Sequence, residues 1–456
     1  MTRVRPTADD REIGRLAVPA FLALVAEPLF LLGDSAVVGH LGTDPLAGLG
    51  IAGTILQTLV GLCVFLAYGT TAGVARQLGA GRRAAALAQG IDGLWLAVVI
   101  GVVVTALGIG LVDQLVALLG PGPGVAGPAA TYLRVALLGV TPLLLMLAAT
   151  GVLRGLQDTR TPLAVAVGGN ALNLLLNVVL VYGAGPLPRL GIRGSALGSV
   201  IAQALSAAVL VAVVVRVARR EGATLAPDLP GIRTAARAGV PLLVRTLTLR
   251  AALLVTTYAV VVSAGRGLGG QAVPIAAHQL AMTVWTFLAF ALDSIAIAAQ
   301  ALTGRYLGAG DAAGTRAVTR RMVGWGVVCG VVTGIGLAAV SPVLGNLFTA
   351  DEAVHRALVP VLLVGALAQP VAGVVFVLDG VLIGAGDGRY LAWAGVVVLA
   401  GYAPLVLLTA HADLPGAALT WVWIVFCVVF TGGRVATLLH RAYGDRWLVT
   451  GAEPAR

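Results

Sequence analysis

Long apolar segments alternate along the chain with short stretches rich in charge, glycine or proline. A helix needs about 20 mainly apolar residues to cross the hydrocarbon core of a bilayer. Counting the segments of that length predicts twelve membrane-spanning helices and no long soluble insertion. Their approximate ranges are 13–38, 46–74, 87–113, 128–152, 161–183, 192–217, 234–263, 275–303, 317–342, 355–382, 389–411 and 416–440. The pattern therefore predicts an all-α membrane protein.

Composition supports this interpretation. Charged residues make up 11% of the 456 residues and hydrophobic residues 59%, whereas soluble domains have about 25% charged residues. The formal net charge is +10. In a soluble protein that charge would suggest a nucleic-acid partner, but here we attribute it to topology and expect no nucleic acid.

The arginines indicate the topology, because cytoplasmic loops of membrane proteins are enriched in basic residues. All 30 basic residues are arginine. With the N-terminus inside, 23 fall on the cytoplasmic side, including Arg434 near the end of the last span, and 5 fall outside. The remaining two, Arg245 and Arg250, lie within the seventh span. Both termini are therefore predicted to be cytoplasmic.

Repeated motifs divide the chain into halves. "ARQLGAG" (75–81) aligns with "GRYLGAG" (304–310), and "GVLRGLQDT" (151–159) with "GVLIGAGDG" (380–388), both at a shift of 229 residues. "AVP" (17–19) recurs as "GVP" (239–241) at a shift of 222. We predict an N-lobe over 1–222, with helices 1–6, and a C-lobe over 223–456, with helices 7–12. Two lobes of six helices each enter the membrane in the same orientation, so a pseudo-two-fold axis along the membrane normal is expected.

Sequence motifs of common enzymes are absent from the chain. It contains no Walker loop, no HExxH and no GxSxG. We therefore predict neither an enzyme nor ATP-driven transport by this chain alone, and no cofactor or bound metal. A channel or receptor, or a membrane-embedded enzyme, is a minor alternative.

Acidic residues inside the predicted spans are the main functional signal. A carboxylate in the membrane is costly and usually marks an ion or substrate pathway. Glu27 and Asp34 lie two turns apart on one face of the first span. Pro28 frees a backbone carbonyl and permits a kink beside Glu27. Asp293 and Asp379 lie in the eighth and tenth spans. They could face a pathway, or they could form buried ion pairs with Arg245 or Arg250, which would then be structural.

Polar uncharged residues in other spans extend this signal. Asn170, Asn173 and Asn177 follow the spacing i, i+3, i+7 and share one face of the fifth span. If this helix neighbours the first, the three amides could hydrogen-bond Asp34 or coordinate a cation. They could equally hold helices together. Gln57 and Tyr68 in the second span could line the same cavity or could be packing residues.

Four segments resemble the multidrug and toxic compound extrusion (MATE) family, and more narrowly its DinF-like bacterial branch. They are "GDSAVVGHLG" (33–42), "GVLRGLQDTRTP" (151–162), "FALDSIAIAAQALTGRYLGAGD" (290–311) and "FVLDGVLIGAGD" (376–387). The resemblance implies two lobes around a cleft and export of organic compounds in exchange for H⁺ or Na⁺. It also implies that Asp34 is the cation-coupling carboxylate of the N-lobe.

Departures from the family pattern favour protons over sodium. The fifth helix of relatives often supplies a second acid, where this chain has Asn177. Asp293 and Asp379 match acids of the C-lobe, but the seventh helix offers only Arg245 and Arg250 in place of an acid. We therefore expect H⁺ coupling through Asp34, with the three asparagines beside it, and Na⁺ as the weaker alternative.

The predicted function is a secondary active exporter that works by alternating access. We expect small organic substrates, cationic or lipophilic, and a monomer that contacts membrane lipid in the bacterial inner membrane. Glu27, Pro28, Gln57, Tyr68, Asp293, Asp379, Arg245 and Arg250 are the candidates for substrate contact or gating. A flippase for lipid-linked precursors, or a polysaccharide exporter of the same superfamily, is the alternative.

Overall fold

The computed structural model describes residues 8–183, 188–266, 272–412 and 417–452, and all regular elements in these ranges are helical. The α-helices are α1 (Ala8–Gly39), α2 (Thr43–Leu62), α3 (Phe65–Gly79), α4 (Arg83–Gly110), α5 (Val112–Leu118), α6 (Pro123–Ala136), α7 (Val140–Gly155), α8 (Arg160–Tyr182), α9 (Ile192–Arg220), α10 (Leu229–Arg266), α11 (Ala272–Gly308), α12 (Ala312–Leu344), α13 (Glu352–Gly384), α14 (Gly388–His411), α15 (Ala418–Val425) and α16 (Gly432–Tyr443). Two short 3₁₀-helices, η1 (Leu137–Gly139) and η2 (Gly345–Leu347), follow α6 and α12, and a π-helix, η3 (Phe426–Thr431), joins α15 to α16.

Twelve helical segments of the described residues are long and apolar enough to cross a membrane. Several spans combine consecutive elements. The second span joins α2 to α3, the fourth joins α6 to α7, and the twelfth runs from α15 through η3 to α16. The twelve spans predicted from hydropathy are confirmed, and the chain is a multi-pass membrane protein.

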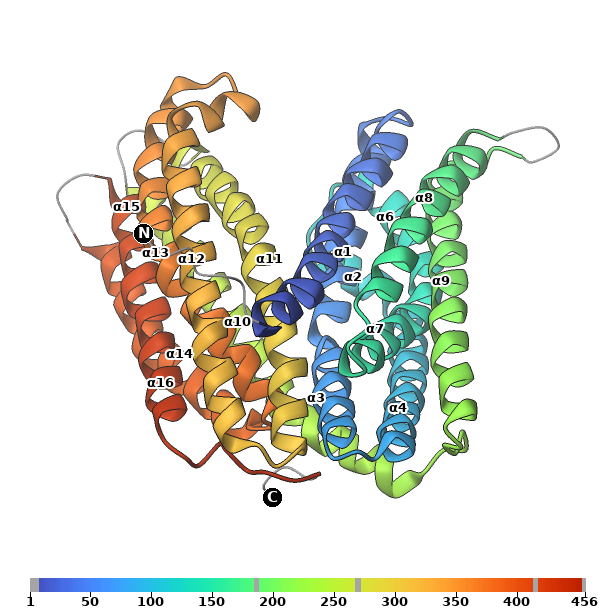
Figure 1. Cartoon of the computed structure of the whole chain (residues 1–456). Helices are drawn as coiled ribbons and strands as arrows, with labels where there is room; N and C mark the ends of the chain where they lie inside the picture. The colour runs from blue at the N-terminus through green and yellow to red at the C-terminus, as the bar shows by residue number, and fades with distance from the viewer. Residues whose placement is uncertain (1–7, 184–187, 267–271, 413–416, 453–456) are drawn as a thin grey trace. The chain divides into compact units, whose positions relative to one another are not determined.

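Contacts among residues divide the chain into two compact units, which we call the N-terminal unit (Val18–Gly239) and the C-terminal unit (residues 8–17 together with the described residues from Val240 onward). Helices α1 and α10 each pass from one unit to the other (Figure 1). The predicted lobes, 1–222 and 223–456, remain a prediction. They differ from these units in the assignment of residues 8–17 and 223–239.

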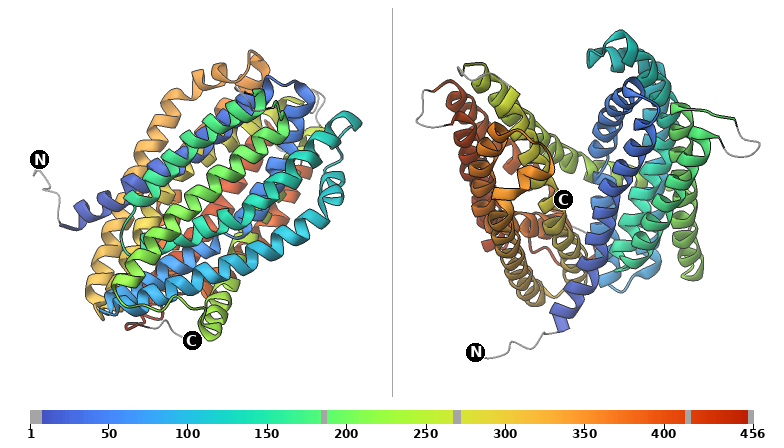
Figure 2. Two further views of the ribbon diagram at one scale, coloured as in Figure 1. Left: turned by 90° about the vertical axis from the view of Figure 1, so that its right-hand side faces the viewer. Right: turned by 90° about the horizontal axis from the view of Figure 1, so that it is seen from above.

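The N-terminal unit is built around α7, which packs against α3, α4 and α9. Helix α9 also lies beside α8, as the left view of Figure 2 shows. Leu133, Leu144 and Val152 are completely buried in the core of this unit. This packing determines which faces of α6, α8 and α9 point toward the interior of the unit.

The C-terminal unit is centred on α13, which packs against both α11 and α12. Small residues allow this close approach, as is common between membrane helices. A methyl group on Gly326 or Gly373 would collide with the backbone of the other glycine, and one on Gly380 would collide with the backbone of Ala296. Helix α13 therefore has little freedom to shift, and its polar residues are held in fixed positions.

The first turns of α1 belong to the C-terminal unit. Asp10 accepts hydrogen bonds from Arg321 and, at 2.8 Å, from Trp325 Nε1, both on α12. Glu12 forms a bidentate ion pair with Arg305 of α11, in which Nη1 and Nη2 of the arginine lie 2.7 and 2.9 Å from the two carboxylate oxygens. Polar contacts thus fix the beginning of α1 to two helices of this unit.

Candidate functional site

Asp34 lies inside the N-terminal unit and is only 4% exposed. Its Oδ1 accepts two short hydrogen bonds, from Asn177 Nδ2 of α8 and Ser195 Oγ of α9, each 2.6 Å long. Its Oδ2 accepts a third from Tyr132 Oη of α6 at 3.2 Å. Four helices therefore contribute one side chain each to a single buried polar cluster, and all three donors to the carboxyl group are uncharged.

The asparagines of α8 share one face, as predicted, but they have different partners. Asn177 donates to Asn173 Oδ1 at 2.9 Å as well as to Asp34, and Asn173 donates to Ser199 Oγ of α9 at 2.9 Å. Asn170 instead donates to the backbone carbonyl of Ala26 on α1 at 2.8 Å. Asn173 and Asn177 thus extend the Asp34 cluster, whereas Asn170 joins two helices. Their role in cation coupling remains a prediction.

Small residues bring α9 close enough for its serines to reach the cluster. Methyl groups on Gly194 and Gly198 would collide with Leu180 of α8 and with the Asn177 side chain, respectively. Spacing of glycines by four residues places both on one face, a common interface between membrane helices. Ser195 and Ser199 are also four residues apart and share a neighbouring face of α9, from which they donate to Asp34 and accept from Asn173, respectively.

Sequence reasoning missed three members of this cluster: Tyr132, Ser195 and Ser199. The repeat of glycine and serine at four-residue spacing in the sixth span was a usable signal for the two serines. Tyr132 had no comparable signal, because a single tyrosine in an apolar span usually packs. Its position beside Asp34 depends on how α6 and α1 meet in the folded unit.

One atom in the cluster has an unused hydrogen-bonding capacity. Asn177 Oδ1 is buried and has no hydrogen-bond partner among the described residues. Its amide nitrogen is committed to Asp34 and Asn173. The cluster therefore contains a carboxyl group and a spare carbonyl acceptor in a site shielded from solvent. Such a group of oxygen atoms can hold a proton or a small cation.

The predicted gating residues near α1 are placed differently. Pro28 is half-buried within α1, which continues as a helix on both sides of it. Glu27 belongs to the same helix, and its side chain lies outside the described residues. Gln57 is exposed on α2, and Tyr68 is half-buried on α3. For these four residues the predicted roles remain predictions.

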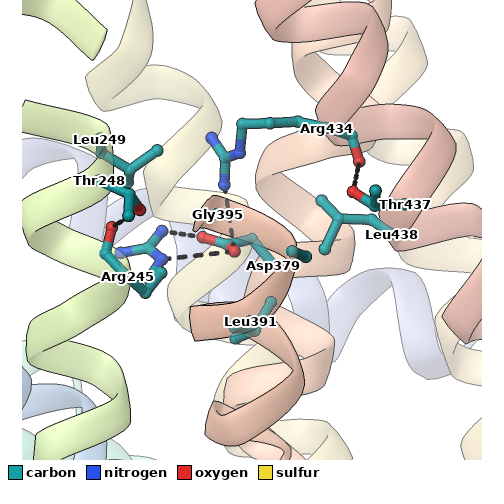
Figure 3. Close-up of a pocket in the computed structure, with 10 residues that line it drawn as sticks. Arg245, Thr248, Leu249, Asp379, Leu391, Gly395, Arg434, Thr437 and Leu438 are labelled. Atoms are coloured by element: carbon teal, nitrogen blue, oxygen red, sulfur yellow. Dashed lines mark hydrogen bonds and ion pairs between the residues drawn. The ribbon is translucent and has the colours of Figure 1, made fainter. Parts of the chain in front are cut away.

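A second charged cluster lies in the C-terminal unit (Figure 3). Asp379 of α13 pairs with Arg245 of α10 through Arg245 Nη2, and Arg245 Nε lies 3.4 Å from Asp379 Oδ1. Arg434 of α16 approaches the same oxygen at 3.1 Å through its Nη2. The ion pair of Asp379 with Arg245, one of the two sequence interpretations, is therefore present. Asp293 is half-buried on α11, and Arg250 is exposed on α10.

The position of Arg434 adds a partner that the sequence analysis did not name when it counted this residue among the cytoplasmic arginines, and its sidedness remains a prediction. Its side chain is 14% exposed and lies within the twelfth span, which extends to Tyr443. An arginine near the end of an apolar run looks like a flanking residue in sequence. The buried carboxylate on another helix, which explains its location, is not adjacent in the sequence.

The family model MatE matches residues 19–179 and 247–408, which is most of both halves of the chain. The chain belongs to the MatE family. The resemblance inferred from the sequence is thereby confirmed, and Asp34 and Asp379 both fall inside the matched ranges of this MatE protein. Members of the family are transporters, so the chain is a membrane transporter and not an enzyme.

Individual relatives support the assignment to MatE. The chain is 31% identical over 434 residues to protein DETOXIFICATION 44, chloroplastic, of Arabidopsis thaliana, covering 90% of this chain and 78% of that protein. It is 29% identical over 446 residues to DNA damage-inducible protein F of Escherichia coli, covering 95% and 93%. The fold is similar to that of the Vibrio cholerae MATE transporter VcmN in its bent form, with a TM-score of 0.84 at 21% identity over 95% and 96% of the chains.

Proposed function

We propose that this transporter expels organic compounds, cationic or lipophilic, in exchange for protons by alternating access. The observation that carries the proposal is the environment of Asp34, which is buried and bonded only to uncharged donors. A buried carboxyl group without a cationic partner favours its neutral form. A related protein of Thermotoga maritima is named "Probable multidrug resistance protein NorM", and that name agrees with this class of substrate.

The hydrogen bonds around Asp34 can serve both of its charge states. When the carboxyl group is ionised, Tyr132 Oη donates to Oδ2. When a proton occupies Oδ2, the tyrosine hydroxyl can rotate and accept, because a phenol group both donates and accepts. Ser195 and Asn177 can continue to donate to Oδ1. Sodium would instead require several oxygen ligands, whereas Asn177 directs its amide nitrogen toward Asp34. These features favour the proton over Na⁺.

Protonation would weaken one particular contact between α1 and α8. Among the described residues, three hydrogen bonds connect these helices: Asn170 to Ala26 O, Asn177 to Asp34, and Tyr182 to Val37 O, with lengths of 2.8, 2.6 and 2.7 Å. Only the middle bond ends on a group that can change charge. Hydrogen bonds to charged acceptors are about twice as strong as neutral ones. Proton binding at Asp34 therefore loosens the centre of α1 against α8 and leaves its two flanking contacts intact.

We place the protein in the bacterial inner membrane with both termini in the cytoplasm, working as a monomer in contact with lipid. In this orientation the proton enters from the acidic outer side and the substrate is released there. Proton loss toward the cytoplasm restores the contact between Asp34 and Asn177. Each half-cycle then stabilises a different conformation, which is what coupling requires.

Efflux from proteoliposomes tests the proposal. Uptake or release of a fluorescent lipophilic cation is followed under a proton gradient or a sodium gradient, applied separately. We expect proton-driven transport in the wild type and its loss in Asp34→Asn. Asp445→Asn is the matched control, because that carboxylate is exposed and pairs with Arg316 at the surface. Full proton-driven transport in Asp34→Asn would refute the proposal, and sodium-driven transport would replace the ion. Flipping of a lipid-linked precursor, with no cation transport under either gradient, would support the alternative function.

A further inference from the structure

The two least exposed carboxylates among the described residues have opposite surroundings. Asp34 and Asp379 are each 4% exposed. Uncharged groups alone donate to Asp34, whereas two guanidinium groups contact Asp379. In the sequence both were acids within predicted spans, Asp34 as the coupling candidate and Asp379 as a candidate for substrate contact, gating or an ion pair. Their surroundings indicate that they do not have the same function.

Asp379 is held from two sides by separate helices. Arg245 reaches it from α10 and engages both carboxylate oxygens, whereas Arg434 reaches it from α16 and engages Oδ1 (Figure 3). The two arginine side chains are only 13% and 14% exposed. The remaining residues that line this pocket are apolar or carry a hydroxyl group, such as Thr248 and Thr437. Asp379 is therefore a carboxylate in contact with two buried cations, and the group of three carries a net charge of +1 when all are ionised.

We propose that Arg245 and Arg434 keep Asp379 ionised throughout the transport cycle, so that Asp379 exchanges no proton and Asp34 alone carries the coupled one. This inference rests on the proposed function, since it assigns proton exchange to one of two candidate groups. Arg245 and Arg434 act as positioning residues. The triad of Arg245, Asp379 and Arg434 is then a permanent network of ion pairs that connects α10, α13 and α16.

Charge balance supports the assignment. Guanidinium groups remain protonated under all conditions a protein experiences. A proton on Asp379 would therefore leave both arginines buried beside a neutral group, and breaking a buried ion pair in this way is strongly unfavourable. Asp34 has no such penalty, because no arginine donates to it. Helix α11 also packs against α13 and carries Asp293. Asp293 is half-buried and is not one of the residues that line the pocket around Asp379.

The local structure of the twelfth span explains how Arg434 reaches the triad. Residues Phe426–Thr431 form a π-helix directly before α16 begins at Gly432. A π-helical turn contains more residues than an α-helical turn and changes the face that following residues present. Arg434 lies in the first turn after this segment. Such insertions occur frequently at functional sites, and here the π-helix precedes the residue that completes the triad.

Proton release upon substrate binding tests the inference. The purified full-length protein, in lightly buffered detergent solution with a pH indicator, is titrated with tetraphenylphosphonium. The variants are Asp34→Asn, the charge-balanced pair Asp379→Asn/Arg434→Gln, and Arg245→Gln/Arg434→Gln. We expect release to fall at least tenfold in Asp34→Asn and to stay within twofold of the wild type in Asp379→Asn/Arg434→Gln. In Arg245→Gln/Arg434→Gln, Asp379 is no longer paired, and release per bound cation should approach twice the wild-type value.

The outcomes separate this inference from the proposed function. Loss of half or more of the released protons in Asp379→Asn/Arg434→Gln, with intact cation binding, would overturn the inference. So would wild-type release in Arg245→Gln/Arg434→Gln. Unchanged release in Asp34→Asn would instead refute the proposed function. Infrared difference spectra on acidification give a second readout. In Asp34→Asn, a remaining band of a buried protonated carboxyl group that is lost when Asp379→Asn is added would also overturn the inference. Absence of such a band assigned to Asp379 would support it.

Discussion

Replacing Gly198 by alanine should disrupt the Asp34 cluster without replacing any of its members. Gly198 is buried on α9 and faces α8. A methyl group at this position would overlap Asn177 Oδ1 and would lie 3.2 Å from the Asn177 backbone nitrogen. The backbone atom cannot move without moving α8. Either the helices separate, or the Asn177 side chain turns away and its hydrogen bond to Asp34 is lost.

The size of the effect follows from three contributions. Overpacking a close helix contact costs about 1–3 kcal/mol. Loss of a hydrogen bond to a charged acceptor costs about 1.5–3 kcal/mol. Alanine is about 1 kcal/mol more favourable than glycine in a helix. If overpacking and loss of the hydrogen bond both occur, the net expected loss of stability is about 1.5–5 kcal/mol. Proton-driven efflux should fall when Asn177 no longer contacts Asp34.

Thermal unfolding in detergent and efflux from proteoliposomes measure the two effects. Gly168→Ala is the matched control, because Gly168 lies in α8 and a methyl group there meets no atom within 4 Å. That variant should be as stable as the wild type or slightly more stable, with unchanged efflux. If Gly198→Ala matches Gly168→Ala in both assays, the close packing of α9 on α8 does not support the cluster, and the reasoning is wrong.

Three further predictions concern single contacts. Tyr132→Phe removes the donor to Asp34 Oδ2 and should lower the kcat/KM of proton-driven efflux about fivefold, the equivalent of about 1 kcal/mol. Tyr182→Phe serves as its control, because that variant loses a hydrogen bond to Val37 O instead. Asp10→Asn should destabilise the protein by about 2 kcal/mol and Glu12→Gln by about 1 kcal/mol, because breaking the more buried ion pair costs more. The side chain of Asp10 is 7% exposed and that of Glu12 is 22% exposed. Equal melting temperatures of the two variants would contradict this order. Gln157→Gly should raise stability by about 1 kcal/mol, since Gln157 has φ of 65°, a conformation that costs L-residues about 1–2 kcal/mol; a lower melting temperature would refute the role of strain.

Hydropathy was sufficient to predict the twelve spans, because a bilayer imposes a length and an apolar character on every crossing helix. The neighbourhood of Asp34 and Asn177 was also predictable. A polar face on the fifth span needed a polar partner, and Asp34 was the strongest candidate in the first span. Both predictions rest on rules that act within one helix or on the need of a buried polar group for a partner.

Contacts that depend on how three or more helices meet could not be predicted. Tyr132 and Ser195 reach Asp34 from helices that no periodicity connects with α1. Arg434 looked like a charged residue flanking a span, and the π-helix that precedes it has no clear sequence signature. Hydropathy describes each helix by itself, whereas the surroundings of Asp379 are set by the joint packing of α10, α13 and α16.

The internal repeat adds an argument for a single proton site. At the shift of 222 residues that aligns 17–19 with 239–241, Asp34 corresponds to Thr256. At the shift of 229, Asn173 corresponds to Tyr402. Thr256 and Tyr402 are completely buried and share a hydrogen bond of 2.6 Å. The C-terminal unit thus has a polar contact between the equivalent helices that is made by two hydroxyl groups. In the N-terminal unit the amide that contacts Asp34 is that of Asn177, which corresponds to the apolar Val406 at the shift of 229. A pair of hydroxyl groups does not change charge in the physiological pH range. If Asp34 carries the proton as proposed, proton binding at this repeated position would change hydrogen bonds in the N-terminal unit and not at Thr256 and Tyr402.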